Sequence, residues 1–433
     1  MTLPVIGFAG LTHLGLVSAV AAAAKGFGVI GFDEDAARVA AINAGRLPVL
    51  EPDLDDLLAK HRDRLAFVDS PAMLAACDLV YVATDVPTDD RGGSDLAGID
   101  RLVTIVTAVL KEAGILTVLC QVPPGYTRRL AWPSRQLYYQ VETLVFGRAV
   151  ERATTPERYI VGCADPGEKL PPALATLLGA YGCPILPMRY ESAELAKISI
   201  NCCLAAAVTV ANTLAELSER IGADWREIVP ALKLDRRIGA FAYLAPGLGI
   251  AGGNLERDLA TVLRFAEATG SEASVIAAFL TNSAHRRDWV LRTLHREVFA
   301  TNPGAALAIL GLAYKENTHS IKNSPSLALI AALRPWRLAL YDPAVAASVV
   351  DHERATAARS ALDAAQGADA LVIMTPWPEF ARLDPAALAQ RMVGRVVIDP
   401  FAILDGDAVR AAGFDYLTLG APLPQPLLGL HHA

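Results

Sequence analysis

The chain has 433 residues, 53% of them hydrophobic, and a formal net charge of −7. Its length predicts two or three domains, and its hydrophobic fraction is large enough for several packed cores. The acidic balance, without any basic tract, excludes nucleic acid as the main partner. We expect no stretch to span a membrane, because Gly, Pro or charged residues interrupt the apolar runs before about 20 residues. The N-terminus lacks the basic start of a secretory signal, so we predict a cytoplasmic protein.

The six cysteines have neither the Cys-x-x-Cys spacing nor the neighbouring histidines of a metal site. We therefore expect no metal and no disulfide, and we predict that the thiols are small buried residues in a reducing compartment. They are Cys77, Cys120, Cys163, Cys183, Cys202 and Cys203.

The N-terminal segment predicts a βαβ unit. A short apolar strand leads into the glycine turn GLTHLG, and the helix that follows would end at Gly26. Apolar strands of this first domain are expected at residues 3–10, 27–33, 76–84 and 115–123. The pattern predicts a doubly wound α/β domain with ligand loops at the carboxyl ends of its strands.

The texture changes near Ser192, where Leu, Ile and Ala recur at helical spacing for some thirty residues. A second alternation of strands and helices follows. Its strands are expected at residues 305–314, 338–343, 368–377 and 395–401. We predict an α/β fold with two doubly wound Rossmann-like domains joined by a long-helix region. The predicted domains are residues 1–190, 191–295 and 296–433.

The glycine turn carries the signals of a dinucleotide site. Gly10 and Gly15 occupy the outer positions of Gly-x-Gly-x-x-Gly, and Thr12 replaces the middle glycine. The helix N-terminus that follows offers N–H groups and a positive dipole end to a pyrophosphate. Asp33, at the end of the second strand, suits ribose hydroxyls and would repel a 2′-phosphate. The cofactor predicted is therefore NAD rather than NADP.

Taken together, the residues resemble those of the UDP-glucose/GDP-mannose dehydrogenases along nearly the whole chain. The stretches that carry the resemblance are INAGRLPVLEPDLDDLL, ERATTPERYIVG, SAELAKISIN, LDRRIG, LAPGLGIAGGNLERDL and ILGLAYKENTHSIKNSPS. The resemblance implies an NAD-binding domain, a nucleotide-sugar-binding domain and a helical region that forms a homodimer. It also implies two successive oxidations of a sugar alcohol, the second through a thioester on a cysteine.

Three departures from the family pattern concern its catalytic residues and their neighbours. The family's catalytic cysteine falls on Asn254, whose carboxamide is a poor nucleophile. Its threonine that places the catalytic water falls on Gln121. In the segment QVETLVFG the first family acid is kept as Glu142, whereas the second has become Phe146.

The rest of the implied catalytic group is present. Lys197 and Asn201 stand at i and i+4 on one helix face, and with Asp258 they match the family's proton-handling residues. The alternatives are a solvated surface lysine at 197, a capping or core amide at 201, and a helix N-terminal acid at 258.

The resemblance also implies binding residues. Those for the cofactor are Gly10, Thr12, Leu14, Gly15, Asp33, Arg38, Thr84 and Lys322. Those for the substrate are Arg237, Tyr243, Gly247, Gly249 and Lys315. His13 lies in the turn where the family has an aromatic residue, so we give it no acid–base role, and Glu51 is expected to shape the fold.

Three functions stay open. The first is altered redox chemistry, in which no thiol captures the sugar aldehyde. The enzyme would then remove a single hydride, or it would epimerise the sugar or eliminate a neighbouring group while NAD stays bound. Ordinary four-electron oxidation would give a uronate. A non-catalytic nucleotide-sugar binding protein would keep the fold alone, but would not need Lys197, Asn201 and Asp258 together.

Overall fold

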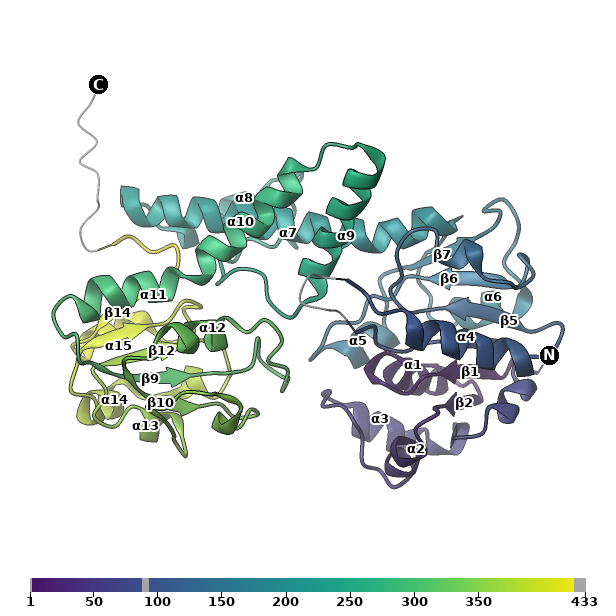
Figure 1. The fold of residues 1–433 in the computed structure, drawn as a ribbon, viewed down its shortest axis with the longest axis horizontal. Helices are drawn as coiled ribbons and strands as arrows, with labels where there is room; N and C mark the ends of the chain where they lie inside the picture. Colours follow the sequence, from purple (N-terminus) through teal and green to yellow (C-terminus); the bar gives the residue numbers. More distant parts are fainter. Residues whose placement is uncertain (1, 88–92, 424–433) are drawn as a thin grey trace. The chain divides into compact units, whose positions relative to one another are not determined.

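The computed structural model describes residues 2–87 and 93–423, which form two compact units that divide between Ile200 and Asn201. Each unit contains a sheet of short apolar strands (Figure 1). Strands such as β1 (Ile6–Ala9) are buried at every residue, as expected where helices cover both faces of a parallel sheet.

The sheet of the first unit has the strand order β3-β2-β1-β4-β5-β6-β7-β8, and only the pair β6 and β7 is antiparallel. Its strands are β1 (Ile6–Ala9), β2 (Val29–Phe32), β3 (Leu65–Val68), β4 (Leu79–Val82), β5 (Ile115–Val118), β6 (Leu137–Gln140), β7 (Tyr159–Cys163) and β8 (Ile185–Arg189). Its helices are α1 (His13–Ala24), α2 (Ala36–Asn43), α3 (Leu54–Lys60), α4 (Ala97–Val109), α5 (Ala149–Thr154) and α6 (Pro172–Gly179). The predicted βαβ unit is confirmed, and Gly26 follows the end of α1 with a φ of 100°.

Two apolar cores hold the helices of this unit on the sheet. One contains buried residues of α1, α3 and α6, and the other contains buried residues of α4. The many alanines of α1 leave little side-chain volume, so this helix packs closely beside the strands that precede and follow it.

The long helix α7 (Tyr190–Ile221) confirms the thirty-residue helical pattern. It also corrects one prediction, because it is long and apolar enough, by length and composition, to cross a membrane. Only 33% of its most apolar window is buried within this chain. A helix that packs against other helices passes the same test of length and composition.

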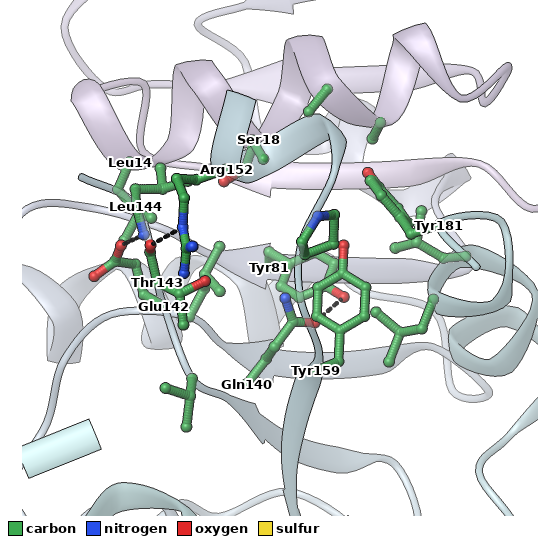
Figure 2. A pocket seen from close by; sticks show the side chains of 18 of the residues that line it. Leu14, Ser18, Tyr81, Gln140, Glu142, Thr143, Leu144, Arg152, Tyr159 and Tyr181 are labelled. Carbon is green, nitrogen blue, oxygen red and sulfur yellow. Dashed lines mark hydrogen bonds between the residues drawn. The ribbon is translucent and has the colours of Figure 1, made fainter. Parts of the chain in front are cut away.

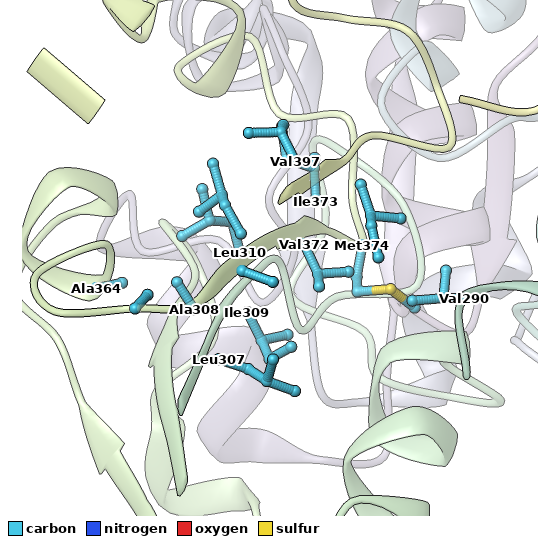
Figure 3. Packing of buried hydrophobic residues seen from close by; sticks show 14 of the residues in the cluster. Val290, Leu307, Ala308, Ile309, Leu310, Ala364, Val372, Ile373, Met374 and Val397 are labelled. Atoms are coloured by element: carbon cyan, nitrogen blue, oxygen red, sulfur yellow. The ribbon is translucent and has the colours of Figure 1, made fainter. Parts of the chain in front are cut away.

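The second unit continues with α8 (Trp225–Leu234), α9 (Asn254–Thr269), α10 (Ser274–Arg287) and α11 (Trp289–Leu294). Its six-stranded parallel sheet has the order β11-β10-β9-β12-β13-β14. The strands are β9 (Ala306–Leu310), β10 (Arg337–Tyr341), β11 (Ala355–Ala357), β12 (Ala370–Ile373), β13 (Val396–Ile398) and β14 (Asp415–Leu417). The sheet's helices are α12 (Pro325–Ala332), α13 (Ala361–Ala364), α14 (Pro385–Arg391) and α15 (Gly406–Ala411). Side chains of β9 and β12 fill the core together with Val290 of α11 (Figure 3).

All six cysteines are free thiols. Cys77, Cys120 and Cys163 are buried, as predicted. The prediction is wrong for Cys203, which is exposed because α7 leaves one face uncovered in this chain. Within residues 2–87 and 93–423, no group of His, Cys, Asp or Glu could hold a metal ion.

Candidate active site

The phosphate turn has the geometry that its glycines predict. Gly10 has a φ of 99°, and a Cβ on Gly15 would lie 1.8 Å from the Gly10 carbonyl oxygen, so only glycine allows α1 to approach β1 this closely. The first turn of α1 contains no acidic residue, which leaves its positive dipole end suited to a phosphate. Thr84 lies against this turn, because a Cβ on Gly10 would lie 3.1 Å from the Thr84 Cβ. The turn therefore fits a dinucleotide.

Asp33 is the buried acid at the end of β2. Its Oδ2 accepts a hydrogen bond from the Leu11 N–H at 2.7 Å, which ties the end of β2 to the phosphate turn. Arg38 donates from Nη1 to both carboxylate oxygens at 2.8 Å. The pairing neutralises a carboxylate that is only 5% exposed. Ribose hydroxyls would share this carboxylate with Arg38.

Two other predicted cofactor residues have different surroundings. The Thr12 hydroxyl oxygen accepts a hydrogen bond from the Asp85 N–H at 2.9 Å, while donation from this hydroxyl to phosphate stays a prediction. Lys322 belongs to the second unit, where its carbonyl oxygen accepts from the Gly252 N–H at 3.1 Å. The structure thus brings Lys322 to the glycine loop that precedes α9, whereas the other predicted cofactor residues lie in the first unit.

His13 and Phe146, where the sequence was expected to depart from the family pattern, contact each other. Their rings stack with centroids 4.1 Å apart. His13 Nε2 also lies 2.8 Å from Oε1 of the buried Glu51. Glu51 also accepts from the Gly147 N–H at 2.7 Å and from the Ala149 N–H at 3.2 Å. Glu51 therefore joins the phosphate turn to the segment after β6, which gives its expected role in shaping the fold specific partners that the sequence did not reveal.

Replacing Glu51 with glutamine should lower the free energy of unfolding by about 2 kcal/mol near neutral pH, because a buried charge-assisted network loses its acceptor charge. Burial raises the pKa of Glu51, but the bonds from His13, Gly147 and Ala149 outweigh it and hold the pKa below the ordinary 4.5. The stabilisation is therefore complete above pH 4.5 and is lost as the pH falls through the folded-state pKa. Urea unfolding at several pH values would measure this.

Glu151→Gln is the matched control, since Glu151 forms an exposed pair with Arg148 and should leave the unfolding midpoint almost unchanged. A Glu51→Gln deficit that stays constant from pH 7 to pH 3 would contradict an ionised Glu51.

Glu142 and Lys197 form an ion pair in the first unit. Lys197 Nζ lies 3.3 Å from Glu142 Oε2, and the two side chains are 12% and 18% exposed. Lys197 is therefore no solvated surface lysine. Glu142 also accepts from the Leu144 N–H, which fixes the turn that follows β6.

The loop after β5 carries Gln121, which is half-buried. Glu194 of α7, 0% exposed, accepts from the Gly125 and Thr127 N–H groups at 2.5 and 2.8 Å. Burial raises the pKa of this carboxyl despite these bonds. Glu194 lies one helical turn before Lys197, so α7 holds the Gln121 loop and presents the lysine. Sequence reasoning missed this role.

A pocket of about 540 Å³, with its open mouth included, lies on the α1 side of the first sheet (Figure 2). Leu14 and Glu142 are the predicted site residues that line it. Its other polar contacts include Tyr81, whose hydroxyl donates to Gln140 Oε1 at 2.8 Å. The pocket is lined by the segment at residues 141–144, which contains Glu142, and by Leu14 of the phosphate turn.

In the second unit, the predicted proton-handling residues Asn201 and Asp258 are both buried and hydrogen-bonded to each other. Arg257 Nε lies 3.2 Å from the other oxygen of Asp258. Asn254 begins α9 one turn before Asp258 and is exposed. Gly253 precedes it with a φ of 87°, so only glycine turns the chain into this helix without strain.

Cys202 is the cysteine near this group in space, although it is distant from Asn254 in sequence. It packs against the apolar cluster that contains Ile250 and Leu259. Burial, Asp258 and Cys203 raise its pKa to about 11. Because the thiolate is the nucleophilic form, Cys202 is a weak nucleophile at neutral pH.

The predicted substrate residues lie on loops of the second unit. Lys315 Nζ lies 5.7 Å from the Tyr314 ring centre, and a Cβ on Gly252 would lie 2.6 Å from the same ring, so these residues meet at the glycine loop. Gly247 donates its N–H to Asn212, and a Cβ on Gly249 would collide with the Ser283 carbonyl. Tyr243 is 56% exposed, and the side chain of Arg237 is 90% exposed beside Asp235.

Three family models match the chain. The NAD-binding domain of the UDP-glucose/GDP-mannose dehydrogenase family matches residues 4–177, its central domain matches 191–283, and its UDP-binding domain matches 308–406. A UDP-glucose 6-dehydrogenase of Pseudomonas aeruginosa is 30% identical, over 95% of this chain and 96% of that protein. The chain belongs to the UDP-glucose/GDP-mannose dehydrogenase family.

Two further relatives agree with this assignment. UDP-glucose 6-dehydrogenase TuaD of Bacillus subtilis is 27% identical, over 96% of this chain and 93% of that protein. The solved UDP-glucose dehydrogenase of Pyrobaculum islandicum superposes with a TM-score of 0.84 at 26% identity, covering 97% of this chain and 98% of that chain. Membership confirms the predicted fold, the NAD cofactor and a nucleotide-sugar substrate, and it makes the protein an NAD-dependent oxidoreductase of the nucleotide-sugar dehydrogenase kind.

Proposed function

We propose that this dehydrogenase removes one hydride from a carbinol of a UDP- or GDP-hexose and forms no thioester. The supporting observation is the chemistry at the first turn of α9, where Asn254 offers only a carboxamide. The thiol of Cys202, near Asp258, has a pKa of about 11 and is packed among apolar side chains. A carbonyl product would therefore meet no thiolate.

The chain's own residues would manage charge and protons. Bound NAD supplies the hydride acceptor. Asp258, the proposed base, would accept the carbinol hydroxyl proton through a water as the carbinol is oxidised. Lys197, paired with Glu142, would stabilise the negative oxygen that develops. Asn201 holds the Asp258 carboxylate in one orientation.

The carbonyl product would have two principal fates. It would be released, or its acidified neighbouring C–H would lose a proton and the sugar would epimerise or eliminate before the hydride returns. The second course is redox-neutral and keeps NAD bound. Four-electron oxidation to a uronate, through the aldehyde hydrate, is the alternative outcome of the test, and so is nucleotide-sugar binding without catalysis.

Incubation of the purified enzyme with UDP- and GDP-hexoses in heavy water would separate these outcomes. We expect at most one NADH per sugar, or deuterium in the sugar without NADH, measured by absorbance and product mass. Two NADH per sugar with a uronate product would contradict the proposal. Binding of the sugar without either change would favour the non-catalytic reading.

Replacing Asn254 with cysteine should convert the reaction toward a four-electron oxidation, because the new thiol at the helix N-terminus would ionise readily and capture the aldehyde. Two NADH per sugar and a sugar mass on the intact protein are expected. Asn254→Ser, which offers no comparable nucleophile, is the control and should yield neither. The account fails if the cysteine variant keeps the wild-type stoichiometry.

We also propose a cytoplasmic homodimer formed by the helical region at residues 191–295. Support comes from an apolar stripe on α7, where Val210, Leu214, Leu217 and Ile221 follow helical spacing and are each between 39% and 54% exposed. Such a stripe on a soluble chain normally faces a partner. A second copy would cover it with the same stripe.

Leu217→Glu should therefore shift the protein from dimer to monomer in light scattering coupled to size exclusion, because a buried unpaired charge is costly. Leu3→Glu changes another exposed leucine outside α7 and should leave the mass unchanged. A monomeric wild type would contradict the proposal.

A further inference from the structure

The loop after β4 forms a reciprocal pair with the N-terminus of α1. The Thr12 hydroxyl, at the N-cap of α1, accepts from the Asp85 N–H at 2.9 Å. In return, Asp85 Oδ2 accepts from the His13 N–H at 3.1 Å. The first turn of α1 contains no acidic residue of its own. Asp85, which is 72 positions away from His13 in the sequence, places a carboxylate there instead.

This carboxylate lies where a dinucleotide needs a donor. Dinucleotide-binding turns offer the N–H groups at the start of this helix to the cofactor's pyrophosphate. One N–H cannot donate fully to a carboxylate and to a phosphate oxygen, and the two anions repel each other at this separation. Asp85 and pyrophosphate would therefore exclude each other from His13 N–H.

The charge of Asp85 is also uncompensated. Within residues 2–87 and 93–423, Asp85 forms no ion pair with a lysine or arginine, whereas Asp33, at the end of β2, is neutralised by Arg38. Asp85 is exposed and lies on a loop, so its carboxylate can leave the helix without breaking a buried core. Both features suit a group that a ligand displaces.

We propose that Asp85 is an internal competitor of the cofactor's pyrophosphate. NAD binds when its pyrophosphate takes the place of the Asp85 carboxylate at the N-terminus of α1. Asp85 thereby lowers dinucleotide affinity. The inference concerns the cofactor turn alone and holds whichever nucleotide-sugar reaction follows.

Asp85→Asn tests this directly, because asparagine keeps the shape and the acceptor oxygen but removes the charge. Isothermal titration of the full-length protein with NAD, ADP-ribose and adenosine would give three dissociation constants. We expect those for NAD and ADP-ribose to fall by the same factor, about three- to tenfold, since an anion at a helix N-terminus is worth roughly this much. Adenosine lacks the pyrophosphate, so its constant should not change.

Asp384→Asn is the matched control, because Asp384 caps α14 of the second unit and is likewise exposed. It should alter none of the three constants. Asp85→Ala should tighten NAD at least as much as Asp85→Asn, since it removes the acceptor as well.

The opposite result is equally clear. If Asp85 only stabilises α1, Asp85→Asn lowers the thermal midpoint and leaves NAD affinity unchanged or weaker, and the proposal is wrong. Equal tightening of adenosine would also overturn it, because the effect would then lie outside the pyrophosphate position.

Discussion

Replacing Lys197 with methionine should lower the rate of hydride transfer by about 10²- to 10³-fold, the usual loss when one preorganised donor to a developing oxyanion is removed. The ammonium of Lys197 is nearly buried and is held 3.3 Å from Glu142, so no flexible reorientation is needed as the oxygen becomes negative. Methionine has a similar length and no charge. Single-turnover NADH formation, with the nucleotide sugar found active, would measure the loss.

Dinucleotide affinity separates this role from a general structural one. Lys197→Met should leave the NAD dissociation constant unchanged, because the phosphate turn lies on other elements. Lys60→Met, which removes an exposed lysine at the end of α3, should change neither rate nor affinity. Glu142→Gln should cost less than Lys197→Met, since the ammonium remains. A rate within threefold of wild type would remove Lys197 from the proposed mechanism.

The parts of the fold that were predictable are those whose signals are local. The turn at residues 10–15 combines two glycines with an apolar strand before it and an alanine-rich helix after it, and α7 shows a helical period throughout its 32 residues. The first signal arises from the backbone freedom of glycine, and the second arises from the burial of apolar residues at helical spacing. The period of α7 did not reveal its single uncovered face, since apolar residues that face a partner look the same as core residues.

The acids that organise the site were not predictable from local pattern. Glu51 reaches the Gly147 N–H across 96 positions, and Glu194 reaches the Thr127 N–H across 67. A carboxylate that accepts from a distant backbone leaves no period in the sequence. His13 and Phe146 are similar, because they lie far apart in the sequence and only the structure shows that their rings stack.

Arg286→Met should lower the free energy of unfolding of the second unit by about 3–5 kcal/mol, the cost of removing one partner from a buried ion pair. Arg286 is 0% exposed and lies 3.2 Å from Glu216 and 3.3 Å from Glu219. Glu219 also accepts from Trp289 Nε1 at 3.0 Å and from the Gly420 N–H at 2.9 Å. Without the guanidinium, this carboxylate on α7 would keep its charge in a buried position while holding both α11 and the segment after β14.

Arg220→Met is a strict comparison, because Arg220 pairs with the same Glu216 at 2.9 Å but its side chain is 49% exposed. Solvent screens that pair, so its loss should cost about 0.5 kcal/mol or less. Urea unfolding followed by tryptophan fluorescence would report both variants, since Trp289 contacts Glu219 directly. Adding Glu219→Gln to Arg286→Met should recover part of the loss, because the unpaired charge is then gone. Equal destabilisation by Arg220→Met and Arg286→Met would mean that burial does not decide the strength of this network, and the tie between α7, α11 and the segment after β14 would need another source.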